Sequence, residues 1–180
     1  FGVGNSWFRV SERAGDVDAV PFGVFRREVF DRVGVFDTTL VRNQDTEFFG
    51  RVARAGLRVY LDPSVRSVYH ARATLGGLLV QGFRNAYWNV LVWTRNPTAF
   101  QWRHAVPGLF VLSLISGVVL APFFPAGPGL LRLEVGVYCC AAVMAAVQIA
   151  VRRHRPLALL LPPIFLLYHL TYGSGSLIGL

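Results

Sequence analysis

The chain has 180 residues, of which 53% are hydrophobic and 16% are charged, and this is more apolar than soluble globular domains usually are. Its net charge of +8 comes from 18 basic residues, all arginine, against 10 acids. Residues 1–104 hold 14 arginines and nine acids, whereas residues 105–180 hold four arginines and one acid. Because the basic excess is spread along the chain, we expect anionic lipid headgroups, and not nucleic acid, as its partner.

Alternating strands and helices are predicted for residues 1–74. Three runs are expected to be extended: Val17–Phe25, Leu57–Leu61 and Val65–His70. A short helix is expected over Arg26–Val33, stopped by Gly34. The pattern is mixed α/β, with too few strands for a complete nucleotide-binding domain. The chain opens with FGVGNSWFRV, without Met or a signal peptide, so we expect it to be the carboxyl-terminal part of a longer protein.

A second helix is predicted after Asn43, ending at Gly56. Asn43 can cap it, and Asp45 and Glu47 fall in its first turn, where the helix dipole stabilises acids. A carboxylate held at a helix amino terminus can also remove a proton from a hydroxyl group as a general base. The residues alone therefore leave two interpretations open, helix-stabilising acids and catalytic acids.

Residues 75–104 are predicted to form an amphipathic helix at a membrane surface, over about Leu75–Trp93, followed by a linker. The spacing of the polar residues places them on one helical face: Gln81, Arg84, Asn85, Trp88 and Asn89. The apolar residues fall mostly on the remainder: Leu78, Leu79, Phe83, Ala86 and Val90. This polar stripe indicates a binding face. The alternative is that Arg84 meets lipid phosphates and Trp88 joins Tyr87 and Trp93 in an aromatic belt.

Residues 105–180 are predicted to be a transmembrane region, because charge-free runs occur near 105–123, 135–151 and 157–180, each close to the length that crosses a bilayer. The loop from Arg152 to Arg155 is cationic, whereas the connection at Pro125–Gly129 is uncharged. Cationic loops stay in the cytoplasm. We therefore expect the amino-terminal domain in the cytoplasm and the carboxyl terminus outside.

Several single features carry weaker signals. Asp16 to Asp18 spells Asp-x-Asp, which we interpret as leading a strand and not as a metal site. His70 could complete a metal site or be a hydrogen-bonded structural histidine. Cys139 and Cys140 are adjacent in an apolar run and are interpreted as small apolar filler. In the last span, Tyr172 and the small residues after it predict close helix packing with a polar contact.

The run VDAVPFGVFRREVFDRVGVFDTTLVRNQDTEFFGRVARAGLRVYLDP, residues 17–63, resembles the second half of a GT-A domain of family 2 glycosyltransferases. It is most similar to polysaccharide-assembly enzymes such as succinoglycan glycosyltransferases. The resemblance continues in QGFRNAYW, residues 81–88, and in HLTYGSGSLIGL at the end. It implies an α/β fold, the acceptor half of a GT-A domain, followed by an all-α bundle of about three transmembrane helices. The family's donor half, with its metal-binding Asp-x-Asp, should precede residue 1.

The resemblance also implies catalytic residues. Asp45 corresponds to the family's general base, Gln44 replaces the usual Glu and would contact the substrate, and Glu47 would orient or support the base. The reaction implied is inverting transfer of a sugar from a nucleotide-diphosphate donor to a lipid-linked or polysaccharide acceptor. A Mg²⁺ or Mn²⁺ ion would accompany the nucleotide sugar, and His70 is the metal-ligand candidate in this chain.

The polar stripe resembles the family's Gln-x-x-Arg-Trp motif. Gln81 and Arg84 would serve the diphosphate and Trp88 the acceptor sugar, although Asn85 occupies the position of the usual Trp. The implied location is the bacterial inner membrane, with several spans and with catalysis at the cytoplasmic face. Two other function classes stay open: a non-catalytic membrane-anchored scaffold or interaction protein, and an export channel or flippase. The channel is disfavoured because three spans with one acid leave little to line a pore.

Overall fold

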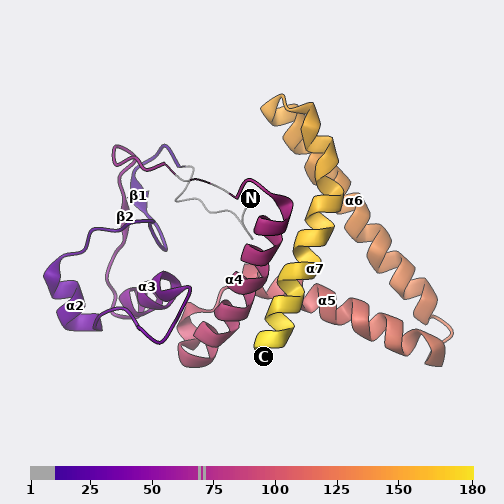
Figure 1. Ribbon diagram of the computed structural model, residues 1–180, viewed down its shortest axis with the longest axis horizontal. Coiled ribbons are helices and arrows are strands. Elements are labelled where there is room, and N and C mark those ends of the chain that lie inside the picture. The colour runs from indigo at the N-terminus through magenta and orange to yellow at the C-terminus, as the bar shows by residue number, and fades with distance from the viewer. Residues whose placement is uncertain (1–10, 69, 71) are drawn as a thin grey trace.

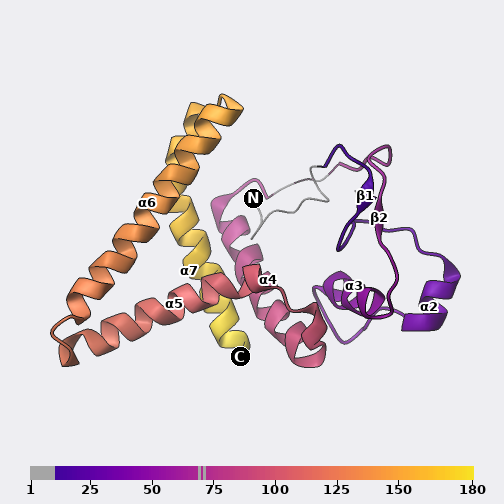
Figure 2. The same cartoon turned by 180° about the vertical axis from the view of Figure 1, so that it is seen from behind.

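The computed structural model describes residues 11–68, 70 and 72–180, and most of these residues are helical (Figure 1). The elements in chain order are β1 Gly15–Asp16, α2 Arg27–Val33, α3 Gln44–Arg54, β2 Tyr60–Leu61, α4 Leu75–Arg95, η1 Pro97–Ala99, α5 Trp102–Leu120, η2 Ala121–Phe123, α6 Gly127–Arg153, η3 Pro156–Leu160 and α7 Leu161–Gly179. The elements before α4 lie on one side of that helix, and α5, α6 and α7 lie on the other (Figures 1 and 2).

The two short helices α2 and α3 lie where the sequence places them. Helix α2 stops at Gly34, which has φ 77° and whose N–H donates to Phe30 O at 2.8 Å. Helix α3 follows Asn43 and ends one residue before its C-cap, Ala55, with Gly56 at φ 68°. Both glycines have the positive φ that favours Gly after a helix, so these predictions are confirmed.

The strand predictions are confirmed only in part. β1 and β2 pair antiparallel, with Gly15 opposite Leu61 and Asp16 opposite Tyr60. The prediction of a strand at 17–25 is wrong, because a turn interrupts it at residues 21–22. The prediction at 65–70 is wrong over the residues described there; Tyr69 lies outside them. Strand-forming residues need hydrogen-bonded neighbouring strands, and a two-stranded pair is marginal alone, so a mixed α/β domain is not clearly present.

Instead of a sheet, a phenylalanine cluster holds this part together. Phe48 on α3 is fully buried and stacks on Phe36 with ring centroids 4.4 Å apart. Phe25 meets the Phe48 ring edge-on at 5.1 Å, and Phe30 on α2 lies 5.6 Å from it. Offset and edge-to-face contacts of this kind are favourable aromatic geometries. The cluster therefore fixes α2 and the adjoining loops against α3.

Three helical segments are long and apolar enough to cross a membrane: Trp102–Phe123, Gly127–Arg153 and Pro156–Gly179. They match the predicted spans, although the second begins earlier, at Gly127. Large apolar side chains such as Val118, Leu133 and Met144 are more than half exposed on them, as expected for a surface that contacts lipid. Cys139 and Cys140 are free and exposed on α6, so they add apolar surface and do not fill a core.

Helix α7 packs closely against α4 and α5 through glycines, which confirms the predicted close packing. A Cβ on Gly175 would overlap the carbonyl of Phe83, and one on Gly173 would overlap the carbonyl of Pro107. A Cβ on Gly179 would lie 2.9 Å from Tyr87 O. Such residues allow the backbones of neighbouring helices to approach one another, as in other membrane helix pairs.

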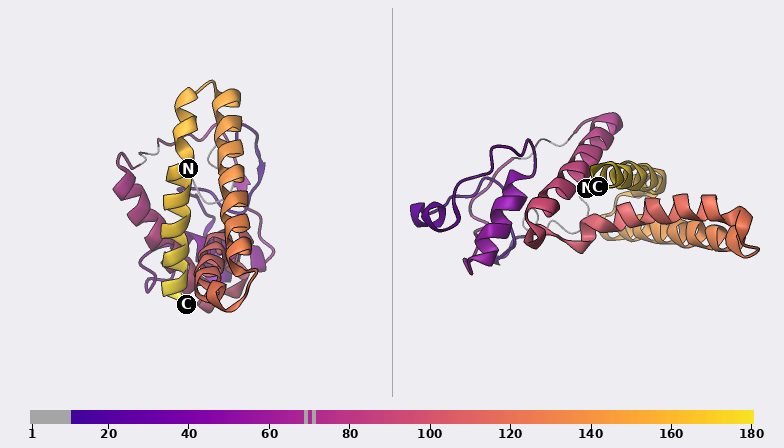
Figure 3. Two further views of the ribbon diagram at one scale, coloured as in Figure 1. Left: turned by 90° about the vertical axis from the view of Figure 1, so that its right-hand side faces the viewer. Right: turned by 90° about the horizontal axis from the view of Figure 1, so that it is seen from below.

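The last turns of α7 lie beside the first turns of α5. A Cβ on Gly108 of α5 would lie 3.1 Å from Ser176 Cβ, and His104 Nδ1 lies 2.9 Å from the Tyr172 hydroxyl. The chain's carboxyl end is accordingly near the start of α5 (Figures 1 and 3). Three successive perpendicular crossings would instead place these two ends at opposite faces of a membrane.

We predict that Gly175→Ala lowers stability by about 1–3 kcal/mol, because the added methyl group must displace backbone atoms of α4. Gly136→Ala in α6 is the matched control, since no atom lies within 4 Å of a Cβ there, and it should be neutral or stabilising by up to about 1 kcal/mol. Unfolding in detergent, followed by tryptophan fluorescence, measures both. Equal stability of the two variants would contradict the close α4–α7 contact.

Candidate functional site

The strongest candidate site is at the start of α3, where Asp45 is exposed to solvent. Its Oδ1 accepts a hydrogen bond from the Thr46 N–H at 2.8 Å, so the helix amino terminus orients the carboxylate. In the described part of the chain no cation pairs with Asp45. An oriented, accessible and unpaired carboxylate can accept a proton from a bound hydroxyl group.

Asn43 lies at the N-cap of α3, as predicted, but the expectation that its side chain caps the helix is wrong. Its backbone is left-handed, with φ 61°, and its side chain makes no capping bond. The amide Nδ2 instead donates to the Asn85 carbonyl at 3.0 Å and to Asn89 Oδ1 at 2.7 Å. The residue thereby attaches the start of α3 to the polar face of α4.

Cationic and amide groups surround the junction between the start of α3 and the polar face of α4. Arg42 Nη1 donates to Asn85 Oδ1 at 3.4 Å. Arg84, which directly precedes Asn85 on α4, is exposed. Gln81 lies one helical turn before Asn85 on the same face and is half-buried. Gln44 donates to Leu40 O at 2.7 Å. Guanidinium groups can bind a phosphate group.

Glu47 has a different environment from Asp45. It is only 7% exposed, and Arg51 Nε donates to both of its oxygens, at 2.9 and 3.0 Å. Asn96 Nδ2 donates to Glu47 Oε1 at 3.2 Å, and Arg51 also donates to the carbonyls of Val33 and Val35. These contacts join α3 to the end of α2 and the end of α4. A role for Glu47 in supporting the base stays a prediction.

Trp88 packs into the apolar contact between α4 and the loop before α3. It lies against the buried cluster of Leu40, Val92 and Ala99, together with Trp93. Its ring also meets Tyr87 edge-on at 5.9 Å. The side of α4 that faces the loop before α3 therefore has two parts. Its amide groups lie toward Asn43, and the indole rings of Trp88 and Trp93 lie toward Leu40. A role for Trp88 in binding a sugar stays a prediction.

Asp37 holds the loop before α3 near the end of α4. It accepts hydrogen bonds from the Thr39 hydroxyl at 2.6 Å and the Thr39 N–H at 2.8 Å, and pairs with Arg95 at 3.4 Å. The hydrogen bonds from Thr39, and then the charge of Arg95, lower the pKa of Asp37 below its usual value. The carboxylate is therefore ionised at neutral pH, and this attachment persists there.

The residues described do not form a metal site. His70 is exposed, and among residues 11–68, 70 and 72–180 no three His, Cys, Asp or Glu side chains could hold an ion together. Asp16 pairs with Arg58 at 2.8 Å; it lies in the short strand β1 and does not lead the predicted strand at 17–25, which is absent. The donor set here does not fit a protein-held Mg²⁺ or Mn²⁺, so no chemical step is assigned to a metal in this chain.

Sequence reasoning missed two polar residues at this junction, Asn96 and His104. Asn96 is 3% exposed and accepts from Arg54 Nη2 at 2.6 Å. His104 contacts Tyr172 near the start of α5. The sequence contained features that could have indicated both residues. Asn96 directly precedes a proline that follows a helix. His104 borders an apolar span, where polar side chains usually have a specific partner.

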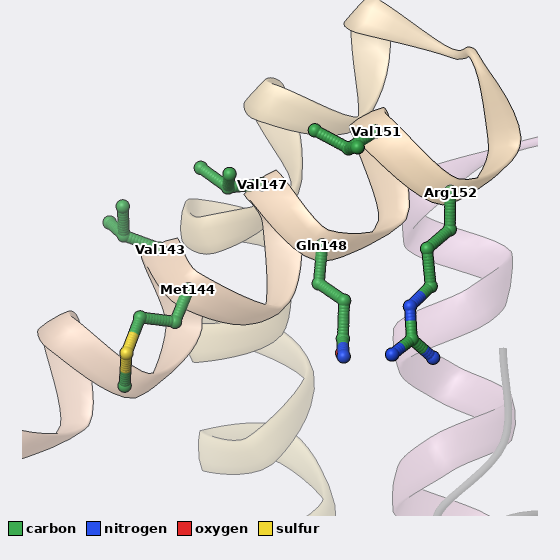
Figure 4. A pocket seen from close by; sticks show the side chains of 6 residues that line it. All are labelled: Val143, Met144, Val147, Gln148, Val151 and Arg152. Atoms are coloured by element: carbon green, nitrogen blue, oxygen red, sulfur yellow. The ribbon is translucent and has the colours of Figure 1, made fainter.

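A groove on α6 is separate from this junction. Figure 4 shows its lining, which comes from one helix: Val143, Met144, Val147, Gln148, Val151 and Arg152. It contains no carboxylate, and α6 lies on the far side of α7 from α3 (Figure 1). The groove therefore has no group that could act as a general base.

Comparison with known proteins gives two relatives, whereas no protein-family model and no solved structure matches the chain. One relative is the dolichyl N-acetyl-alpha-D-glucosaminyl phosphate 3-beta-D-2,3-diacetamido-2,3-dideoxy-beta-D-glucuronosyltransferase of Methanococcus voltae, 22% identical over 98% of this chain and 51% of that protein. The other is the succinoglycan biosynthesis protein ExoA of Rhizobium meliloti (strain 1021), 24% identical over 84% of this chain and 44% of that protein.

The chain thus spans about half the length of the curated relatives it matches. Both matches extend from the amino-terminal part into the apolar helices, since they cover most of the chain. The predicted relationship to family 2-like glycosyltransferases is therefore confirmed at low identity.

Proposed function

We propose that this chain supplies the acceptor side of a membrane-bound, inverting glycosyltransferase. The enzyme transfers a sugar from a nucleotide-diphosphate donor to a lipid-linked or polysaccharide acceptor at the cytoplasmic face of the bacterial inner membrane. The observation that carries the proposal is the exposed carboxylate of Asp45, which pairs with no cation among the described residues. It lies two residues after Asn43, whose side chain binds the polar face of α4.

In the proposed reaction, Asp45 removes the proton of the acceptor hydroxyl while its oxygen bonds to the anomeric carbon of the donor sugar. The bond from that carbon to the phosphate oxygen breaks on the opposite face, and the nucleotide diphosphate leaves with the electron pair. Arg84 and Arg42 stabilise the negative charge that develops on the diphosphate. Glu47 keeps α3 in place through Arg51 and Asn96.

The relatives' names support the acceptor class. One relative is named for a dolichyl-linked sugar phosphate and the other for succinoglycan biosynthesis. A nucleotide sugar is the donor that we infer from the resemblance, and a Mg²⁺ or Mn²⁺ ion would bind with its diphosphate through groups other than the residues described. When bound, the ion neutralises phosphate charge.

For the membrane topology, we propose that α5 and α6 cross and that α7 stays tilted beneath α4. At about 1.5 Å per residue, His104 and Gly108 lie within about 10 Å of the start of α5, whereas Tyr172 and Ser176 lie about 15–25 Å from the start of α7. If α5 and α7 both begin at the cytoplasmic face, their contact requires α7 to remain near that face. The chain's carboxyl end is then cytoplasmic, in contrast to the outside position expected from three full crossings.

The topology prediction is tested in the full-length protein with reporter fusions. A reporter active only in the cytoplasm should be active after Leu180, because α7 does not reach the far face. An insertion at Pro125 should be active only with an external reporter, and one after Arg153 only with a cytoplasmic reporter. External activity after Leu180 would restore three complete crossings.

The proposed base is tested by Asp45→Asn in the full-length enzyme. The variant keeps the shape and the hydrogen bond from Thr46 but cannot take a proton at neutral pH. We expect kcat to fall by about 10² to 10⁴, the usual contribution of a general base, with donor KM nearly unchanged. Steady-state kinetics with donor and acceptor varied separately measure this effect.

The matched control is Glu47→Gln, two residues along the same helix. Because it leaves Arg51 without its charged partner, we expect a loss of stability of about 1–3 kcal/mol and a smaller change in the rate per folded molecule. A parent-like kcat for Asp45→Asn would end the catalytic assignment, and the chain would then match a membrane-anchored scaffold instead.

Arg84→Gln tests the phosphate role of the polar stripe. Since Arg84 is exposed, the variant should keep its stability but raise the KM for the nucleotide sugar about tenfold, as expected for loss of one charge-assisted contact. Arg66→Gln, at another exposed arginine, is the control and should leave KM unchanged. Weaker liposome binding with unchanged KM would assign Arg84 to lipid phosphates.

A further inference from the structure

One chain of hydrogen-bonded side chains connects the start of α3 to three other helices. Asn43 Nδ2 donates to Asn89 Oδ1 at 2.7 Å, and Asn89 Nδ2 donates to the Tyr172 hydroxyl at 2.7 Å. The Tyr172 hydroxyl is in turn hydrogen-bonded to His104 Nδ1 at 2.9 Å. These residues belong to the start of α3, α4, α7 and α5, in that order.

Asn89 is the central member of this chain. It is 5% exposed, and its carbonyl oxygen and its amide nitrogen each bond to a different element. Tyr172 is 2% exposed. A buried amide or hydroxyl without partners is strongly disfavoured. The contact of Asn43 with α4 and the packing of α4 against α7 are therefore favourable only in the arrangement that satisfies Asn89 on both sides.

The geometry of Asn43 explains why this chain reaches the candidate base. Asn43 has a left-handed backbone, which asparagine adopts more readily than most residues, and this directs its amide away from its own helix. Glu47 N–H still donates to the Asn43 carbonyl at 3.1 Å, which starts the helix. Asp45 follows two residues later. The contact between Asn43 and Asn89 is thus one of the attachments that hold the segment carrying Asp45 against α4.

We propose that Asn89 and Tyr172 are positioning residues that fix Asp45 at the membrane helices. They act through Asn43 and touch neither donor nor acceptor. The inference rests on the proposed function of Asp45, but its structural part, the attachment of α3 to α4 and α7 through Asn89, can be measured without activity. A displacement of about 1 Å at a reacting group can lower turnover about 100-fold, so loss of the attachment should reduce kcat.

The test uses the full-length enzyme and two substitutions that keep side-chain shape. Asn89→Leu removes both amide groups, and Tyr172→Phe removes only the hydroxyl. Tyr138→Phe is the matched control, because Tyr138 is hydrogen-bonded to His169 Nδ1 at 2.8 Å between α6 and α7 and has no contact with Asn43 or Asn89 among the bonds described. All variants are made with Cys139→Ala and Cys140→Ala.

Two readouts are combined. Spin labels at the exposed residues Val41 and Val80 report the distance between the α3 loop and α4, and steady-state kinetics report kcat and KM. We expect Asn89→Leu to broaden the distance distribution and lower kcat about 10- to 100-fold with donor KM unchanged. Tyr172→Phe should do the same to a smaller extent, and Tyr138→Phe should change neither quantity.

A double variant tests whether Asn43 and Asn89 act together. Asn43→Gly removes the amide and keeps the left-handed backbone, since glycine adopts it freely. If both residues act through their shared bond, the double variant loses less kcat than the product of the two single losses, because interacting residues are not additive. It can still lose more than Asn89→Leu alone, since Asn43 also donates to the Asn85 carbonyl. Multiplied losses in the double variant would overturn the proposal.

The outcomes separate this proposal from the proposed function. A narrow, parent-like distance distribution in Asn89→Leu overturns the attachment, and a broad distribution with parent-like kcat overturns its role in positioning. If Asn89→Leu does not fold, Tyr172→Phe decides by the same two criteria. A parent-like kcat for Asp45→Asn defeats the catalytic role of Asp45, while the spin-label distances still decide whether Asn89 attaches α3.

Discussion

Hydrogen-bond satisfaction of the buried Asn89 is the constraint on which the arrangement of the chain depends. Its amide needs partners because it is buried, and those partners come from the loop before α3 and from α7. Apolar packing alone would allow the loop before α3 to slide along α4, since apolar contacts are not directional. Because the amide of Asn89 must keep its hydrogen bonds, the loop before α3 can occupy only one position along α4. The glycines of α7 complete this arrangement, because Tyr172 approaches Asn89 only if α7 lies close to α4.

The first turn of helix α3 carries two acids in different environments. Glu47 faces the interior, where Arg51 and Asn96 occupy its oxygens, whereas Asp45 faces solvent and keeps its carboxylate free of cations among the residues described. The two acids lie two positions apart, which places them on different sides of a helix. A buried, paired carboxylate stabilises the fold, and an exposed carboxylate can exchange a proton. The first turn of α3 contains one carboxylate of each kind.

The sequence was sufficient for features that depend on local chemistry. Helix ends at Gly34 and Gly56, the amphipathic helix α4 and the three apolar segments all follow from periodicity, glycine and charge, and the structure confirms them. The strands were not predictable in this way, because a β-strand exists only with a paired neighbour. The side-chain direction of Asn43 was equally inaccessible. Its partners are more than 40 residues away in the sequence, and capping was the local expectation.

Under the proposed function, the acceptor hydroxyl group lies at a limited height above the membrane, so the proposed base must be fixed in orientation as well as in distance. One attachment would fix the distance of α3 from α4 but not the rotation of α3 about its own axis. Helix α3 has two, through Asn43 at its start and through the Glu47–Asn96 contact one turn later. The first reaches Asn89 within α4 and the second reaches Asn96 at its end, and Leu40 and Trp88 make an apolar contact as well. Two hydrogen-bonded points and one apolar contact prevent α3 from rotating about its axis, and that restriction fixes the side of α3 from which Asp45 faces solvent.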